Sequence, residues 1–194
     1  MPLHRVPAIT LLLSLFLLSG CATVIAPFSS APMDMNHGKR TFGAKIEDQS
    51  IETKVKVNLK RSGIPLSEQR IVAVSYNGNV LLAGQVASAD LKTQAGQLAK
   101  RIRHVRHVHN ELTVVGAGST LARLNDSWLT SKVKLRLMLA GDAPAGRTKV
   151  VTESGIVYLM GLLSRDEAAA VVAQAQKVYG VQKIVKIIEY IENP

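Results

Sequence analysis

The chain contains an internal repeat, and this repeat constrains its fold more than any other feature of the sequence. Residues 48–56 align with residues 126–134, and residues 77–84 align with residues 154–161. Each copy contains several predicted helices and strands, so it is a small domain rather than one unit of a solenoid. A chain of 194 residues is long enough for two such domains.

Each copy predicts the same five elements in the same order. An apolar helical period begins the copy, after Asp48 or Asp126, which we expect to be the N-caps. Two strands follow (70–76 and 80–86; 148–152 and 156–162), joined by the tight-turn pairs 77–78 and 154–155. A second apolar helix and a last strand (105–114; 181–191) complete the copy. The predicted fold class is α+β, with two tandem α-β-β-α-β domains, each a three-stranded mixed sheet with two helices on one face.

The hairpin of each copy carries a repeated glycine and aliphatic pattern. The second glycine of each pattern, Gly84 or Gly161, interrupts an apolar strand, so we expect a β-bulge or a close backbone approach there. The pattern resembles the signature of BON domains, and that resemblance implies a structural role for its residues. They are Gly78, Val80, Leu82 and Gly84 in the first copy, and Gly155, Val157, Leu159 and Gly161 in the second.

The N-terminus has the pattern of an exported protein. A basic start, an apolar run and small residues at 1–20 predict a signal peptide. Leu18-Ser19-Gly20-Cys21 resembles the lipobox of bacterial lipoproteins, which implies cleavage before Cys21 and its acylation. The alternative is an ordinary secreted protein with a chance cysteine. We expect a flexible tether over 21–46, a first domain over 47–115, a linker over 116–124 and a second domain over 125–192.

Two BON-like domains behind a lipobox resemble the dual-BON outer-membrane lipoproteins. Ala22 follows the lipidated cysteine, and in enterobacteria-like sorting an Asp there would retain a lipoprotein in the inner membrane. The resemblance therefore implies anchoring in the outer membrane, facing the periplasm. It also implies binding of anionic phospholipid through the second domain, support of envelope integrity and recruitment to division sites.

The first helix of the second copy has two apolar faces. One face (Leu129, Val133, Leu137 and Ala140) matches the core face of the first copy (Ile51, Val55 and Leu59). The other (Trp128, Leu135 and Leu139) lies about 100° away and becomes Ser50, Val57 and Arg61 in the first copy. This additional face either packs against the first domain or the tether, or contacts a membrane, or binds a protein partner.

Membrane contact is the interpretation we favour. The ring of Trp128 suits the headgroup level, where its N–H group stays hydrated. Lys132, Lys134 and Arg136 lie on the same helix and could reach lipid phosphates. The first copy has the larger excess of basic residues, so charge alone would point to the other domain. The predicted partner is an anionic phospholipid membrane.

Composition excludes several classes of function. The net charge of +10 suits anionic partners, but export and the lack of aromatic-interleaved basic strands argue against nucleic acid. His107 and His109 share a strand face beside arginines that disfavour a cation, so we expect no metal site. We predict a non-enzyme without cofactor or small-molecule substrate. The alternative function is a periplasmic scaffold that binds an envelope protein, such as an assembly factor or a cell-wall regulator.

Overall fold

The computed structural model describes residues 38–62, 70–115 and 123–192, and residues 35–194 belong to one unit. In its first half, helix α2 (Phe42–Arg61) is followed by strands β1 (Arg70–Tyr76) and β2 (Asn79–Val86), helix α3 (Ala89–Lys100) and strand β3 (His107–Val114). In its second half, helix α4 (Arg123–Leu139) and a short 3-10 turn, η1 (Ala145–Arg147), precede β4 (Thr148–Glu153), β5 (Ile156–Leu163), α5 (Arg165–Gln176) and β6 (Lys183–Tyr190).

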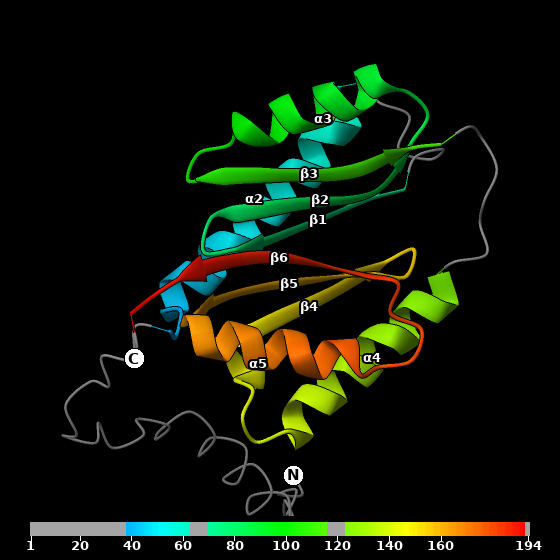
Figure 1. The fold of residues 1–194 in the computed structure, drawn as a ribbon. Helices are drawn as coiled ribbons and strands as arrows, with labels where there is room; N and C mark the ends of the chain where they lie inside the picture. Colours follow the sequence, from blue (N-terminus) through cyan, green and yellow to red (C-terminus); the bar gives the residue numbers. More distant parts are fainter. Residues whose placement is uncertain (1–37, 63–69, 116–122, 193–194) are drawn as a thin grey trace, which may run out of the picture. The chain divides into compact units, whose positions relative to one another are not determined.

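The two halves repeat one topology (Figure 1). In each sheet the middle strand pairs antiparallel with the strand before it and parallel with the strand after the second helix. The strand order is β1-β2-β3 in the first sheet and β4-β5-β6 in the second. The predicted α+β class, with two α-β-β-α-β domains and mixed three-stranded sheets, is therefore confirmed.

Each domain has its own apolar core between its sheet and its two helices. The first core contains the predicted helix residues Ile51, Val55 and Leu59 together with Val80 and Leu82. The second core repeats this arrangement and adds the half-buried Ala140 at the end of α4. Its equivalent residues are Leu129, Val133, Leu137, Val157 and Leu159.

The hairpin turns have the backbone conformation that their residues predict. Asn77 and Gly78 have φ of 52° and 75°, and Ser154 and Gly155 have φ of 52° and 76°. Positive φ at both central residues is the geometry of a type I′ turn. A Cβ on Gly78 would lie 2.8 Å from the carbonyl oxygen of His104, so this position also needs the small residue.

The two aspartates are not N-caps, and this prediction is wrong. Asp48 lies inside α2, where its carboxylate accepts the Asn77 N–H at 2.8 Å and the Gly78 N–H at 3.0 Å. Asp126 in α4 accepts the N–H groups of Ser154 at 2.8 Å and Gly155 at 2.9 Å. Each aspartate thus binds the hairpin turn of its own domain. The two aspartates occupy equivalent positions in the repeat because each domain has the same turn to hold.

Helix α2 begins earlier than the sequence suggested. The Thr41 side chain accepts the Ala44 N–H at 3.1 Å and caps the helix, which starts at Phe42. Residues 42–46, expected to be tether, are therefore helical. The added turn brings Arg40 close to the core: its Nη1 lies 2.6 Å from Asp48 Oδ2, and its guanidinium lies 3.7 Å from the centre of the Tyr76 ring.

The strand glycines do not form bulges, because each is paired one to one with both neighbouring strands. Gly84 pairs with Ile71 and Leu112, and Gly161 pairs with Thr148 and Ile188. Gly84 instead has a φ of 119°, which disfavours residues with a side chain. A Cβ on Gly161 would lie 3.0 Å from the carbonyl oxygen of Arg147. Of the two predicted alternatives, close backbone approach is found at Gly161. At Gly84 the glycine is needed for its positive φ.

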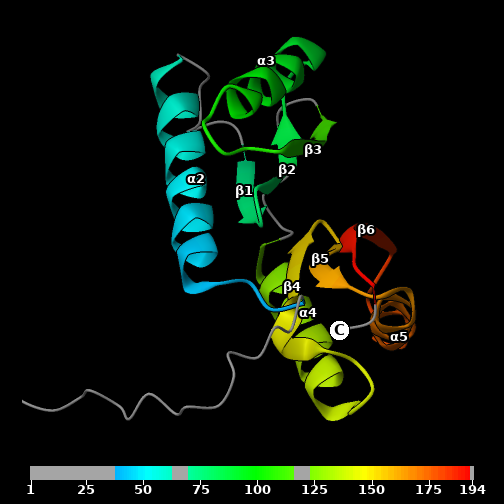
Figure 2. The same cartoon turned by 90° about the vertical axis from the view of Figure 1, so that its left-hand side faces the viewer.

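The sheet faces turned away from the helices share a third apolar core (Figure 2). Tyr76, Leu81 and Ala83 of the first sheet pack with residues of β5 and β6 from the second. Burial raises the pKa of Tyr158 in this core to about 12, and nearby Glu111 and Glu153 add to the effect. Both faces of each sheet are therefore covered. The second sheet contributes Tyr158, Met160, Leu162 and Ile187.

Polar contacts border this shared core. Lys149 Nζ lies 2.8 Å from Glu52 Oε1, and the Tyr76 hydroxyl donates to the Arg147 carbonyl at 2.6 Å. Glu189 accepts from Arg106 and from two asparagine amides of the first hairpin. Among the described residues, no helix is both long and apolar enough to cross a bilayer.

Candidate functional site

Helix α4 presents large apolar side chains to solvent on the face that the sequence singled out. Trp128 is 62% exposed, Leu135 53% and Leu139 77%. The first domain packs against the second through the sheets, and no described residue covers these three side chains. Within the described residues this excludes burial of the face against the first domain. Burial by the tether lies outside them, because residues 1–37 are not described.

The structure adds Met138, which is 63% exposed, to this face. On the helical wheel it lies about 60° from Leu135, on the side away from the core. We call Trp128, Leu135, Met138 and Leu139 the α4 apolar face. Sequence comparison missed Met138 because it fell between the two faces considered, although its place between Leu137 and Leu139 was a usable signal. Four large apolar side chains exposed on one helix make this face a candidate interaction surface.

The three predicted basic residues border the α4 apolar face on different sides. Lys132 Nζ lies 5.3 Å from the centre of the Trp128 ring, within cation–π range. Arg136 reaches towards α5 instead, and its Nε lies 3.3 Å from Gln174 Oε1. Lys134 is exposed on the opposite side, where it lines a shallow groove of about 200 Å³ with Met138. Positive charge thus lies on both sides of the apolar cluster.

The first domain serves as an internal control for this helix. At the positions equivalent to Leu135 and Leu139 it has Val57, which is 39% exposed, and the exposed Arg61. Its exposed Phe42 and Ile46 lie in the unexpected first turns of α2. Phe42 is equivalent to residue 120, which is not described, and Ile46 to Leu124 of α4, whose side chain is not described. At the compared positions, the two exposed leucines Leu135 and Leu139 therefore belong to α4 and not to α2.

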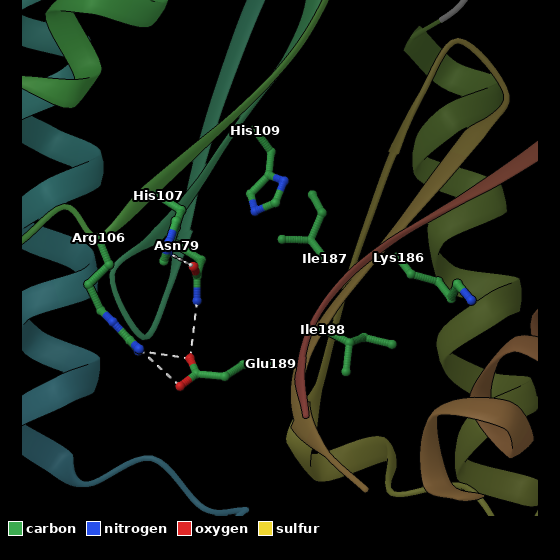
Figure 3. A pocket seen from close by; sticks show the side chains of 8 residues that line it. All are labelled: Asn79, Arg106, His107, His109, Lys186, Ile187, Ile188 and Glu189. Carbon is green, nitrogen blue, oxygen red and sulfur yellow. Dashed lines mark hydrogen bonds and ion pairs between the residues drawn. The ribbon is translucent and has the colours of Figure 1, made fainter. Parts of the chain in front are cut away.

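The two histidines lie in a cleft between β3 and β6 (Figure 3). His107 Nδ1 is 3.2 Å from Asn79 Oδ1, and His109 faces Ile187 across the cleft. Burial, followed by the nearby His107, lowers the pKa of His109. Hydrogen bonds from Arg106 and the asparagines lower the pKa of Glu189 despite its burial. Within the described residues, no three potential metal ligands gather.

The remaining predicted site residues divide into two groups. The glycine and aliphatic signature residues build the turns and cores, as described above, and none lies on the α4 apolar face. The predicted lipidation site, Cys21, lies outside the described residues. Of the predicted site residues, those of α4 are therefore the ones that the structure gathers on an exposed surface.

Comparison with known proteins agrees with the repeated architecture. The BON domain family model matches twice, at residues 47–116 and 125–192. The chain is 37% identical to "Outer membrane lipoprotein DolP" of Haemophilus influenzae, over 90% of this chain and 91% of that protein. It is 35% identical to "21 kDa hemolysin" of Actinobacillus pleuropneumoniae, over 79% of each chain.

A more distant relative has the same kind of match. The chain is 26% identical to "Osmotically-inducible protein Y" of Escherichia coli, over 84% of this chain and 79% of that protein. Two matched domains, two copies of the α-β-β-α-β topology and the extent of the first similarity agree with one another. The chain therefore belongs to the BON domain family, as a DolP-like protein with two BON domains.

Proposed function

We propose that this protein is an outer-membrane lipoprotein that binds anionic phospholipid through the α4 apolar face. The similarity to a protein named an outer membrane lipoprotein supports the location. The observation that carries the binding proposal is the joint exposure of Trp128, Leu135, Met138 and Leu139 between cationic side chains. In this proposal Cys21 carries the permanent anchor, on the periplasmic face, and α4 docks the folded domains onto the membrane surface.

Two effects contribute to the binding free energy: insertion of apolar side chains and attraction between opposite charges. Apolar side chains gain about 25 cal/mol for each Å² that leaves water. Each basic residue near an anionic surface adds about 1 kcal/mol, and this part weakens with salt. Trp128 contributes to both effects, because its ring favours the membrane–water interface and the Lys132 ammonium group lies over that ring. Support of envelope integrity and recruitment to division sites, which the family resemblance implies, belong to the same proposal.

Tryptophan emission tests the proposal directly, because Trp128 is the only tryptophan of the chain. The mature, non-acylated protein, with Cys21→Ser, is titrated with phosphatidylglycerol vesicles and with phosphatidylcholine vesicles. We expect solvent-exposed emission that shifts to the blue with the anionic vesicles only. Emission that is already blue and unchanged by lipid would contradict the proposal, since it would mean that another part of the chain covers the face.

A matched pair of variants distinguishes binding through α4 from non-specific adsorption of exposed apolar side chains to the vesicles. Leu135→Gln removes an exposed apolar side chain from α4, and Val57→Gln makes an equivalent change on α2. We expect Leu135→Gln to weaken vesicle binding about tenfold, the equivalent of about 1.4 kcal/mol, and Val57→Gln to leave it unchanged. Equal losses in both variants would refute a role specific to α4. If the wild-type protein bound neither anionic nor zwitterionic vesicles, the result would favour the alternative function, a scaffold that binds an envelope protein.

A further inference from the structure

The outer edge of β6 is open in the part of the chain that the structure describes. In the order β4-β5-β6, β6 pairs only with β5, so half of its backbone N–H and C=O groups point away from the sheet. The strand is rich in β-branched residues: Ile184, Val185, Ile187 and Ile188. Its exposed side chains are Lys183, Lys186 and Tyr190, and the apolar ones are half-buried or buried. An open edge strand is a template for pairing with another extended chain.

A groove runs along this edge on the side of helix α5, which lies next to β6 in Figure 2. Its volume is about 390 Å³, within the range of ligand-binding pockets. The helix contributes small side chains, which leave room beside the strand. Those facing the groove are Ala168, Ala169, Val172 and Ala173.

The first domain again supplies an internal control. At the position of Lys186 it has Asn110, whose Nδ2 donates to the Lys92 carbonyl of α3 at 2.7 Å. A Cβ on Gly96 of that helix would lie 2.7 Å from the same Asn110 nitrogen. Asn110 therefore bridges β3 to α3 and fills the space between them. In the second domain no equivalent bridge forms, because the lysine is exposed instead.

The charge of the groove indicates what it would accept. Its lining residues include Arg165 at one end and Lys186 further along the strand, and no carboxylate. The Arg165 guanidinium carbon lies 5.1 Å from the centre of the Tyr190 ring, so a cation and an aromatic ring line the groove at that end. The acids next to lining residues in sequence are turned to other partners or to solvent. Glu167 pairs with Arg147, Glu189 pairs with Arg106 in the cleft beside β3, and Asp166 is exposed. An acidic ligand with apolar side chains matches this lining.

The other side of the same edge is also hollow. The cleft between β3 and β6 has a volume of about 280 Å³, and Ile187 and His109 face each other across it (Figure 3). Lys186 points away from His109, towards the other side of the strand. Successive side chains of an added strand alternate between the two faces of a sheet. They would enter the groove and the cleft in turn.

We propose that the open edge of β6 binds an extended, acidic peptide segment of a partner protein by strand addition. Backbone hydrogen bonds to β6 supply affinity, and the groove and the cleft select side chains. The positive groove selects Asp or Glu in the segment. This site uses α5, β6 and the cleft beside β3, and it shares no residue with the α4 apolar face, so the proposal is independent of lipid binding.

The experiment uses the mature protein with Cys21→Ser as bait for a displayed library of eight-residue peptides, the length of β6. Enriched peptides are synthesised with a fluorescein label, and their affinity is measured by polarisation. We expect them to be acidic and rich in β-branched residues, and their binding to weaken with salt. Failure to enrich any peptide, or enrichment of basic peptides, would overturn the proposal.

Two variants locate the bound peptide. Ala173→Leu fills the groove from an exposed helix position, where leucine is a good helix former, and should weaken binding at least about tenfold. Its control is Gln97→Leu, at the equivalent exposed position of α3, which should leave affinity unchanged. Equal affinity for the wild type and Ala173→Leu would place the peptide elsewhere and refute the site. Trp128→Ala should leave peptide affinity unaltered, since the two surfaces are separate.

Modified peptides test the mode of binding. Strand addition uses the amide groups of alternate peptide residues. N-methylation of one alternate set of amides should therefore abolish binding, and methylation of the other set should preserve it. Equal effects of the two sets would rule out strand addition. Reduced hydrogen exchange at residues 183–190 of the complex is the expected result on the protein side, and unchanged exchange there would contradict the proposal.

Discussion

Leu159 and Met160 are neighbours in β5, yet their side chains lie in two different apolar cores. Leu159 packs under α4 and α5 in the core of the second domain, whereas Met160 packs in the core shared by the two sheets. Both side chains are fully buried. The pair therefore allows the stability of one domain and the coupling between domains to be perturbed separately.

The first prediction uses this pair. Leu159→Ala and Met160→Ala should each lower the free energy of unfolding by about 2–5 kcal/mol, the usual cost of such a cavity. The outcomes should differ in kind, because Leu159→Ala weakens the second domain and Met160→Ala weakens the contact between domains. Urea unfolding followed by Trp128 emission and by circular dichroism would show this. Transitions from the two probes that separate only in Met160→Ala are expected, and coincidence in that variant would contradict the coupling.

The second prediction concerns the carboxylate of Asp48. Burial alone would raise its pKa, but hydrogen bonds from Gly78, Ser75 and Asn77 and the contact with Arg40 outweigh burial and lower it. A pKa lowered by folding stabilises the protein above the unfolded value, and this stability is lost as pH falls through the folded value. Urea midpoints should therefore fall as pH drops below about 4.

Variants at Asp48 separate this effect from general acid unfolding. Asp48→Asn should cost about 2 kcal/mol at pH 7, because hydrogen bonds to a charged group are lost. Its disadvantage should shrink as the pH approaches the folded pKa. The exposed Asp166→Asn is the control and should cost a few tenths of a kcal/mol. A disadvantage of Asp48→Asn that is independent of pH would contradict the assignment.

The third prediction compares two glycines with similar backbone angles. Gly78 and Gly141 have φ of 75° and 71°, but only Gly78 has atoms in the way of a Cβ, the nearest being the His104 carbonyl oxygen at 2.8 Å. Gly141→Ala should cost about 1–2 kcal/mol, the price of the left-handed conformation alone. Gly78→Ala should cost more, because the clash adds to the strain. Thermal unfolding of both variants checks the order, and equal costs would show that the loop can move aside.

The fourth prediction concerns Arg106 and Glu189, which join the domains at the mouth of the cleft. Their closest atoms are 2.8 Å apart, and the side chains are 48% and 32% exposed. A partly exposed pair of this kind should couple by about 0.5–1 kcal/mol. A double-mutant cycle with Arg106→Ala and Glu189→Gln measures the coupling, which should decrease in 1 M salt. A salt-independent coupling would mean that packing, not charge, links these residues.

The fold could be predicted because two copies of the sequence repeat the same local signals. The helical periods and the turn pairs at 77–78 and 154–155 occur at equivalent places, so each copy supports the reading of the other. The same comparison isolated Trp128, Leu135 and Leu139, since a core position must recur in both copies and an additional surface need not. Within the residues that the structure describes their exposure is confirmed, and their contact with lipid stays a prediction.

Two features escaped the sequence because they depend on distant partners. Asp48 fits the pattern of an N-cap, and only the folded chain brings it to the turn at Asn77 and Gly78. The core shared by the two sheets could have been predicted from the sequence. Apolar residues on both faces of β2, such as Val80 and Leu81, are typical of a strand covered on two sides.

The shared core has a consequence for experiments that divide the chain. A single domain expressed alone would expose Tyr76, Leu81 and Ala83, or their partners on the second sheet, to water. An uncovered apolar sheet face of this kind promotes association with other molecules. A truncated protein that loses activity, or gains an unexpected partner, would therefore report on an exposed sheet and not on the missing domain. Point substitutions in the intact chain are the reliable way to assign a role to either half.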